Sequence, residues 1–199
     1  MKEIARGAEA VLYLDNNTLI KDRIKKDYRI DKIDKYLRAT RTKKEAKLLE
    51  KSSKLIHVPK VIEYEEEKIF MEFIDGMLVR DALDVADKKQ KKHILACIGE
   101  GIKKLHENSI IHGDLTTSNM ILKDNKLYFI DFGLGLISEK IEDMAVDMHL
   151  LKQALFSKHH ETAEDCFNEI LKKYEPSKEF LKRFEKVEGR GRYKRKQIL

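Results

Sequence analysis

The first 75 residues contain short, mostly apolar runs that are separated by turn-forming or charged residues. Short β-prone runs bounded in this way are typical of strands. Between the runs, a longer stretch has many good helix formers and no glycine or proline, which predicts a helix over residues 31–55. We expect a small sheet-rich lobe that ends near residue 75. Its predicted strands are residues 2–5, 10–14, 18–23, 61–64 and 69–73.

Beyond residue 75 the apolar positions follow a helical period, and they predict a second, helical lobe over residues 76–188. The spacing is clearest where Ile94, Ile98 and Ile102 recur every four residues. Near the end of the lobe, Phe180, Leu181 and Phe184 are predicted core residues. The predicted helices are residues 88–107, 141–156, 161–174 and 177–187.

A β-hairpin interrupts this helical pattern. Two β-prone segments, residues 119–122 and 126–130, flank Asp124-Asn125, which is typical turn chemistry. A hairpin places the outer ends of its two strands side by side, so side chains just outside the strands converge. The polar side chains in these positions are Asp114, Asn119 and Asp131.

Two carboxylates and an amide oxygen suit a magnesium ion that also binds a phosphoryl group, because hard cations take oxygen ligands and leave positions for substrate phosphates. The pattern H-x-D-x-x-x-x-N from His112 to Asn119, followed by D-F-G at Asp131, resembles the catalytic and magnesium loops of the protein-kinase superfamily. This resemblance implies an α+β, bilobal, protein-kinase-like fold that binds ATP and Mg²⁺.

Within this resemblance, the first lobe supplies the nucleotide contacts. A turn would cover the phosphates, although alanines replace two glycines of the usual G-x-G-x-x-G loop. Lys21 on the third strand would reach the phosphates, with Glu45 as its favoured ion-pair partner and Glu50 as the alternative. Backbone groups between the lobes would hold the adenine. The implied nucleotide-binding residues are Gly7, Ala8, Glu9, Ala10, Lys21, Met71, Glu72, Phe73 and Ile74.

Charge and cysteine usage narrow the function classes. The net charge is +6, and residues 189–199 hold five Lys or Arg and no acid, so the basicity is a tail rather than a surface-wide nucleic-acid site.

Cys97 and Cys166 are far apart, which indicates neither a zinc site nor a disulfide framework. The first residues are not a signal peptide, and no apolar run approaches the roughly 18 residues of a membrane span. We therefore expect a cytoplasmic protein without a membrane partner.

The second lobe is shorter than that of a typical protein kinase. Only 66 residues follow Gly133, and no Ala-Pro-Glu segment is among them. Gly113 stands where the H-R-D motif has an arginine that pairs with an activation-loop phosphate. We expect a minimal C-terminal lobe without a full activation segment and without control by such a phosphate.

The combination of motifs resembles one family along essentially the whole chain, the small atypical kinases/ATPases of the KEOPS (EKC) complex, which are PRPK-like. Its most specific parts are the Gly-Ala-Glu-Ala turn, the Lys-x-Tyr-Arg stretch and the short ending. The matching segments are Arg6-Gly7-Ala8-Glu9-Ala10, Ile20-Lys21-Asp22-Arg23, Lys26-x-Tyr28-Arg29, Arg41-Thr42-x-x-Glu45-Ala46, Ile111 to Asn119 and Ile130 to Leu134.

This family resemblance implies an ATPase or Ser/Thr kinase that supports threonylcarbamoyl-adenosine modification of tRNA. It also implies a threonylcarbamoyl transferase subunit as partner, fused in the same chain in some archaea, a small KEOPS subunit on the N-terminal lobe, and tRNA bound through the complex.

The resemblance also assigns roles to individual residues. Asp114 would be the catalytic base or would position water, and Asn119 and Asp131 would hold Mg²⁺. Lys21 would bind the phosphates and Glu45 would fix Lys21. The residues implied to reach tRNA or the partner are Arg190, Arg192, Lys194, Arg195 and Lys196.

Three alternatives stay open. A RIO-type ribosome-assembly kinase shares a similar H-G-D stretch, although the Gly-Ala-Glu-Ala turn argues against it. A catalytically idle scaffold would bind only the partner and tRNA, but Lys21, Asp114, Asn119 and Asp131 are all present. For the basic residues after 188, a disordered solubilising terminus is the alternative to a binding tail.

Overall fold

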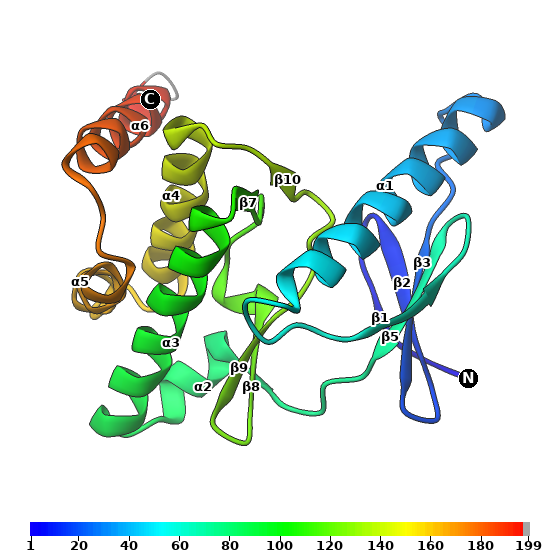
Figure 1. Cartoon of the computed structure of the whole chain (residues 1–199), viewed down its shortest axis with the longest axis horizontal. Coiled ribbons are helices and arrows are strands. Elements are labelled where there is room, and N and C mark those ends of the chain that lie inside the picture. The colour runs from blue at the N-terminus through cyan, green and yellow to red at the C-terminus, as the bar shows by residue number, and fades with distance from the viewer. Residues whose placement is uncertain (197–199) are drawn as a thin grey trace.

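The N-terminal lobe contains a five-stranded antiparallel sheet in the order β1-β2-β3-β5-β4, with helix α1 (Asp31–Ser52) packed against it (Figure 1). The computed structural model describes residues 1–196, and side chains as far as Arg190. All five strands were predicted, with bounds within one residue. Helix α1 ends at Ser52, before the predicted residue 55, because serines are weak helix formers. The strands are β1 (Lys2–Arg6), β2 (Ala10–Asp15), β3 (Thr18–Arg23), β4 (Val61–Tyr64) and β5 (Lys68–Glu72).

Apolar packing fixes α1 on this sheet. Ala46 and Leu49 of the helix are buried in one cluster with Ile69 and Met71 of β5. Burial of such a side chain contributes about 1.5–3 kcal/mol. The C-terminal half of α1 is therefore held firmly, and with it the position of Glu45.

The second lobe begins with two short elements that the sequence analysis did not predict, β6 (Met77–Leu78) and α2 (Val79–Val85). Helix α3 (Lys88–Glu107) has the predicted bounds, and its apolar stripe is buried as expected. A capping box fixes its start, because Gln90 N–H donates to Asp87 Oδ1 at 2.8 Å and Asp87 N–H donates back to Gln90 Oε1 at 3.1 Å.

The predicted hairpin is present as β8 (Met120–Lys123) and β9 (Lys126–Phe129), and β6 extends it to a three-stranded sheet. Asp124 and Asn125 both have positive φ, 48° and 59°, as a two-residue hairpin turn requires. A second antiparallel pair, β7 (Ile110–Ile111) and β10 (Leu136–Ile137), joins the two ends of the segment that contains the hairpin.

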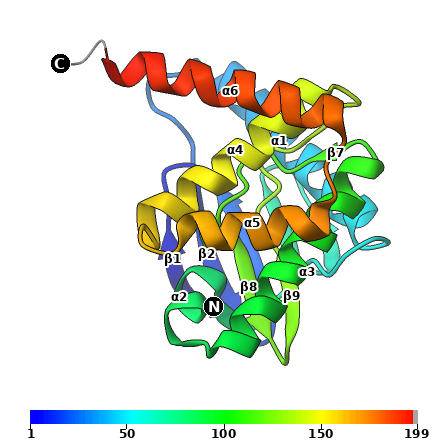
Figure 2. The same ribbon diagram turned by 90° about the vertical axis from the view of Figure 1, so that its left-hand side faces the viewer.

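Three helices complete the lobe: α4 (Ile141–Lys158), α5 (Ala163–Tyr174) and α6 (Lys178–Lys196). Figure 2 shows α6 lying over α4, with α5 below them. The predicted end of the last helix at residue 187 was wrong, because α6 continues to Lys196 through most of the basic segment. Leu181 is 39% exposed, so its assignment to the core was also wrong. Within residues 1–196, no helix is long and apolar enough to cross a membrane.

Candidate active site

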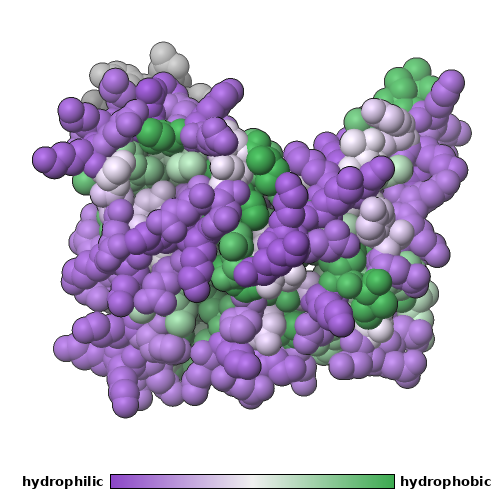
Figure 3. Space-filling view, in the orientation of Figure 1, coloured by the Kyte–Doolittle hydropathy of each residue, from purple (hydrophilic) through white to green (hydrophobic). Residues whose placement is uncertain are grey.

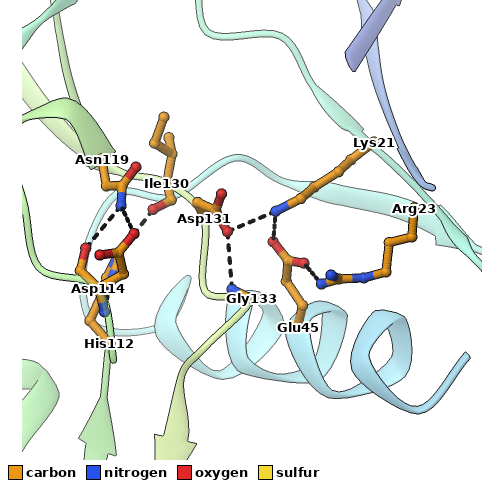
Figure 4. Close-up of polar contacts among 9 residues, drawn as sticks. All are labelled: Lys21, Arg23, Glu45, His112, Asp114, Asn119, Ile130, Asp131 and Gly133. Carbon is orange, nitrogen blue, oxygen red and sulfur yellow. Dashed lines mark hydrogen bonds and ion pairs between the residues drawn. The ribbon is translucent and has the colours of Figure 1, made fainter. Parts of the chain in front are cut away.

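Lys21 of β3 and Glu45 of α1 form a buried ion pair between the sheet and the helix (Figure 4). Lys21 Nζ lies 2.7 Å from Glu45 Oε1, and Glu45 is only 1% exposed. Buried charges are tolerated when they are paired, so this ion pair offsets the cost of burying both side chains. The prediction that Glu45 rather than Glu50 pairs with Lys21 is confirmed.

Arg23 is a second cation on Glu45, and the sequence analysis did not single it out. Its Nη2 lies 2.5 Å from Glu45 Oε2, and its side chain is buried. Arg23 follows Lys21 by two residues in β3, and residues two apart on a strand share one face. That spacing was the signal in the sequence that could have identified it.

Asp131 connects the two lobes. Its Oδ1 lies 2.7 Å from Lys21 Nζ and accepts the Gly133 N–H at 3.1 Å. Partial burial opposes ionisation of Asp131, but the Lys21 ammonium and the Gly133 N–H outweigh it and hold the pKa of Asp131 below its usual value. Burial likewise opposes the charged form of Lys21, but Glu45 and Asp131 hold the pKa of Lys21 above its usual value. The Lys21–Asp131 pair is therefore ionised at neutral pH.

Asp114 and Asn119 form the other half of the site. Asn119 Nδ2 donates to Asp114 Oδ2 at 2.8 Å and to the Asp114 carbonyl at 2.9 Å. These bonds fix the amide, and Figure 4 shows its oxygen directed away from Asp114. His112 braces the loop, because its Nε2 donates to the Ile130 carbonyl at 3.0 Å and its Nδ1 accepts the Asp114 N–H at 3.3 Å. Burial lowers the pKa of His112, which favours this neutral tautomer.

Asp147, a buried carboxylate on α4, holds the loop that contains His112 and Asp114. It accepts the N–H groups of His112 and Gly113 at 2.8 and 2.9 Å. His106 Nε2 lies 3.3 Å from Asp147, and His106 Nδ1 lies 2.9 Å from the Tyr174 hydroxyl. His106 is thus a hydrogen-bonded core residue.

Gly113 is required by the shape of the same loop. Its φ is +82°, and a Cβ on it would lie 2.4 Å from the Leu134 carbonyl oxygen. Any other residue would be strained at this φ and would clash with backbone. The arginine of an H-R-D motif therefore cannot take this position without moving the segment after Gly133.

A pocket between the lobes is lined by seven of the predicted site residues, whereas Glu45 and Asn119 lie outside its lining. Its lining carries four cations, and the turn over residues 6–10 forms one wall. No atom lies within 3.4 Å of the place that a Cβ on Gly7 would take, so steric crowding does not require glycine there. The lining residues are Ala5, Arg6, Gly7, Ala8, Glu9, Ala10, Leu12, Lys21, Arg23, Arg41, Asp114, Asp131, Gly133 and Leu134.

The residues between the lobes are not part of this lining. Met71 and Ile74 are buried in the core, and the N–H groups of Glu72 and Phe73 donate to the carbonyls of Lys60 and Asn17. The side chains of Met71 and Ile74 therefore serve the fold, and an adenine contact through the remaining backbone groups of residues 71–74 stays a prediction.

Arg190, the first of the basic residues near the end of the chain, is not part of the pocket lining. Arg190 forms an ion pair with Glu142 of α4, which also lies 3.1 Å from Arg183. The side chains of the other predicted tail residues lie outside the described residues; these are Arg192, Lys194, Arg195 and Lys196.

The donor set fits magnesium bound together with a polyphosphate. Among the described residues, no group of three or more His, Cys, Asp or Glu side chains could hold a metal alone. Asp131 and Asn119 instead offer one carboxylate and one amide oxygen, and Mg²⁺ is typically bound by one or two protein ligands with substrate phosphates and water. The cations of the lining would compensate the charge of those phosphates.

Comparison with known proteins defines the class first. The family profile described as "RIO domain" matches residues 13–136, more than half of the chain. The crystal structure of a Rio2 kinase–ADP/Mg²⁺–phosphoaspartate complex from Chaetomium thermophilum superposes with a TM-score of 0.61, 16% identity and coverage of 98% of this chain and 72% of that chain. The chain therefore has a protein-kinase-like fold and contains a RIO domain.

Comparison with individual sequences narrows the family further. The KEOPS complex subunit Bud32 of Pyrococcus abyssi is 40% identical over 98% of this chain and 97% of its own length. A probable serine/threonine-protein kinase BUD32 homolog of Archaeoglobus fulgidus is 37% identical over 94% of each chain. A probable bifunctional tRNA threonylcarbamoyladenosine biosynthesis protein of Methanothermobacter thermautotrophicus is 38% identical over 96% of this chain but 36% of the longer protein. The chain belongs to the Bud32 family. The profile match shows that it shares a domain with RIO-type kinases, and the relatives described above support the Bud32 assignment over a RIO-type kinase.

Proposed function

We propose that this chain is a Mg-ATP-dependent atypical Ser/Thr kinase or ATPase that acts as the Bud32 subunit of a KEOPS complex in the threonylcarbamoyladenosine modification of tRNA. The observation that carries the proposal is the convergence of Lys21, Asp131 and Asp114 on one pocket between the lobes. A catalytically idle scaffold would not need these charged groups, and neutral side chains could stand in their places.

Each residue has a separate task in this proposal. Lys21 neutralises phosphate charge, and Glu45 keeps its ammonium directed at the pocket. Asp131 and Asn119 would hold Mg²⁺, which when bound would stabilise charge on the phosphates. Asp114 would orient the attacking hydroxyl or water and take its proton, since a carboxylate next to the reacting group is the usual base in this class.

The surface supports a partner on the N-terminal lobe. Apolar side chains gather at the projecting end of α1 and in the loop before it (Figure 3). Tyr28 is 78% exposed and Tyr36 is 70% exposed, with Ile30 and Ile33 between them. Exposed apolar patches of this kind mark protein contacts, and a small KEOPS subunit fits this place. The fusion architecture of the Methanothermobacter relative supports a transferase subunit as the second partner.

The basic end of α6 is proposed to contact tRNA or the transferase subunit. The five cationic residues in 189–199 offer a local contact for an anionic partner. Helix α6 presents the first of them at a fixed place on the lobe. Arg190 is already paired with Glu142, so the residues after it would contribute most of the attraction to phosphate.

ATP turnover tests this function in three steps: the chain alone, the chain with a threonylcarbamoyl transferase subunit, and both with tRNA. We expect Mg²⁺-dependent turnover in the chain alone and a higher rate when both partners are present. Mixtures without the chain are the control. No turnover in any mixture would contradict the enzyme, and a rate that ignores both partners would contradict the KEOPS role.

A further inference from the structure

The turn that faces the nucleotide pocket is poorly anchored by apolar packing. All residues of β1 are exposed, and so are Gly7, Ala8 and Glu9 of the turn. Segments with few buried apolar contacts open locally at low free energy. The position of this turn over the pocket therefore depends on its polar contacts.

Three such contacts tie the turn to other parts of the lobe. Ile24 N–H donates to the Glu9 carbonyl at 3.1 Å, and Lys26 Nζ donates to the Ala8 carbonyl. The third joins side chains, because Arg41 Nη1 lies 2.8 Å from Glu9 Oε2. This ion pair connects the turn directly to α1.

Arg41 is well placed for this connection. It precedes Glu45 by four residues in α1, and residues four apart lie on the same helix face. Both Arg41 and Glu9 line the pocket that contains Lys21 and Asp131. The helix that positions the phosphate-binding lysine thus also holds the phosphate-facing turn.

We propose that the Arg41–Glu9 ion pair is a latch that holds the turn over the phosphates of bound ATP, so that both are positioning residues. The proposal rests on the proposed function. A half-exposed ion pair adds little to the free energy of unfolding, because water screens the attraction between its charges. Its effect should therefore appear in nucleotide affinity rather than in global stability.

Steady-state kinetics of Glu9→Gln, Arg41→Gln and the double variant test the latch. Each single variant is expected to raise the KM for ATP about three- to fivefold, with kcat within about twofold. The double variant should be no worse than either single, because one ion pair can be lost only once. Arg41→Lys should restore most of the affinity. Lys35→Ala is the control: it removes an exposed ion pair between α1 and Glu66 of the β4–β5 turn, and it should leave KM unchanged.

Two kinetic results would overturn the latch. One is an unchanged KM in Glu9→Gln beside a raised KM in Arg41→Gln, since Arg41 would then act on the nucleotide itself. The other is a double variant whose effect is the product of the two singles.

Hydrogen–deuterium exchange separates the latch from the proposed function. In the nucleotide-free protein, peptides that cover residues 5–12 should exchange about three- to fivefold faster in both single variants than in the wild type. Unchanged exchange overturns the latch whatever the kinetics show. A wild type without ATP turnover contradicts the proposed function, and the exchange still reports the ion pair.

Discussion

Replacement of Asp114 by alanine is expected to lower ATP turnover about 10³-fold and to leave ATP affinity within about threefold. Asp114 lines the pocket, whereas the Lys21–Glu45 pair and Asp131 form a separate cluster that the change does not touch. Asn119 keeps one of its two hydrogen bonds, because the Asp114 backbone carbonyl remains. The loop should therefore stay in place while the reacting group loses its base. Turnover and ATP binding are measured separately.

Asp165→Ala is the matched control, because this aspartate is exposed on α5 and takes no part in the pocket. It should keep wild-type turnover. Wild-type turnover in Asp114→Ala would show that Asp114 does not act on the reacting group, and a parallel loss of ATP binding would show that it acts in binding instead.

Replacement of Asp147 by alanine is expected to lower the free energy of unfolding by about 2–5 kcal/mol. The change leaves the N–H groups of His112 and Gly113 without their acceptor in a buried place, and each unsatisfied group costs about 1–3 kcal/mol. The catalytic loop should also lose its position, so turnover should fall even in the fraction that is folded. Urea unfolding measures the stability.

Val146→Ala on the preceding residue of α4 is the control, because Val146 is 40% exposed and surface changes usually stay within about 0.5 kcal/mol. Equal stability of the Asp147 and Val146 variants would mean that water or another group replaces the carboxylate.

Elements with strong local signals could be predicted from the sequence. Helix α3 has a capping box and a regular apolar stripe, and its bounds were predicted to the residue. The hairpin has a turn pair that suits positive φ. The site motifs lie beside this hairpin, so predicting the hairpin also predicted that Asp114, Asn119 and Asp131 lie near the same end of its strands.

Features that depend on distant contacts could not be predicted in the same way. Helix α2 has seven residues and is held by burial of Val79 and Leu83 rather than by its own pattern. The spacing from Lys21 places Arg23 on the same face of β3, but its bond to Glu45 appears only when the strand and helix are packed together. Likewise, the continuation of α6 beyond residue 187 has no apolar stripe to indicate it.

The central claim is that Asp131 and Asn119 hold a magnesium ion against a nucleotide whose phosphates meet Lys21. Calorimetric titration of ATP into the wild type and Asp131→Asn, each with and without Mg²⁺, tests it most directly. The account predicts that Mg²⁺ strengthens ATP binding at least about tenfold in the wild type and has little effect in Asp131→Asn. An equal gain from Mg²⁺ in both proteins, or no ATP binding in the wild type, would contradict it.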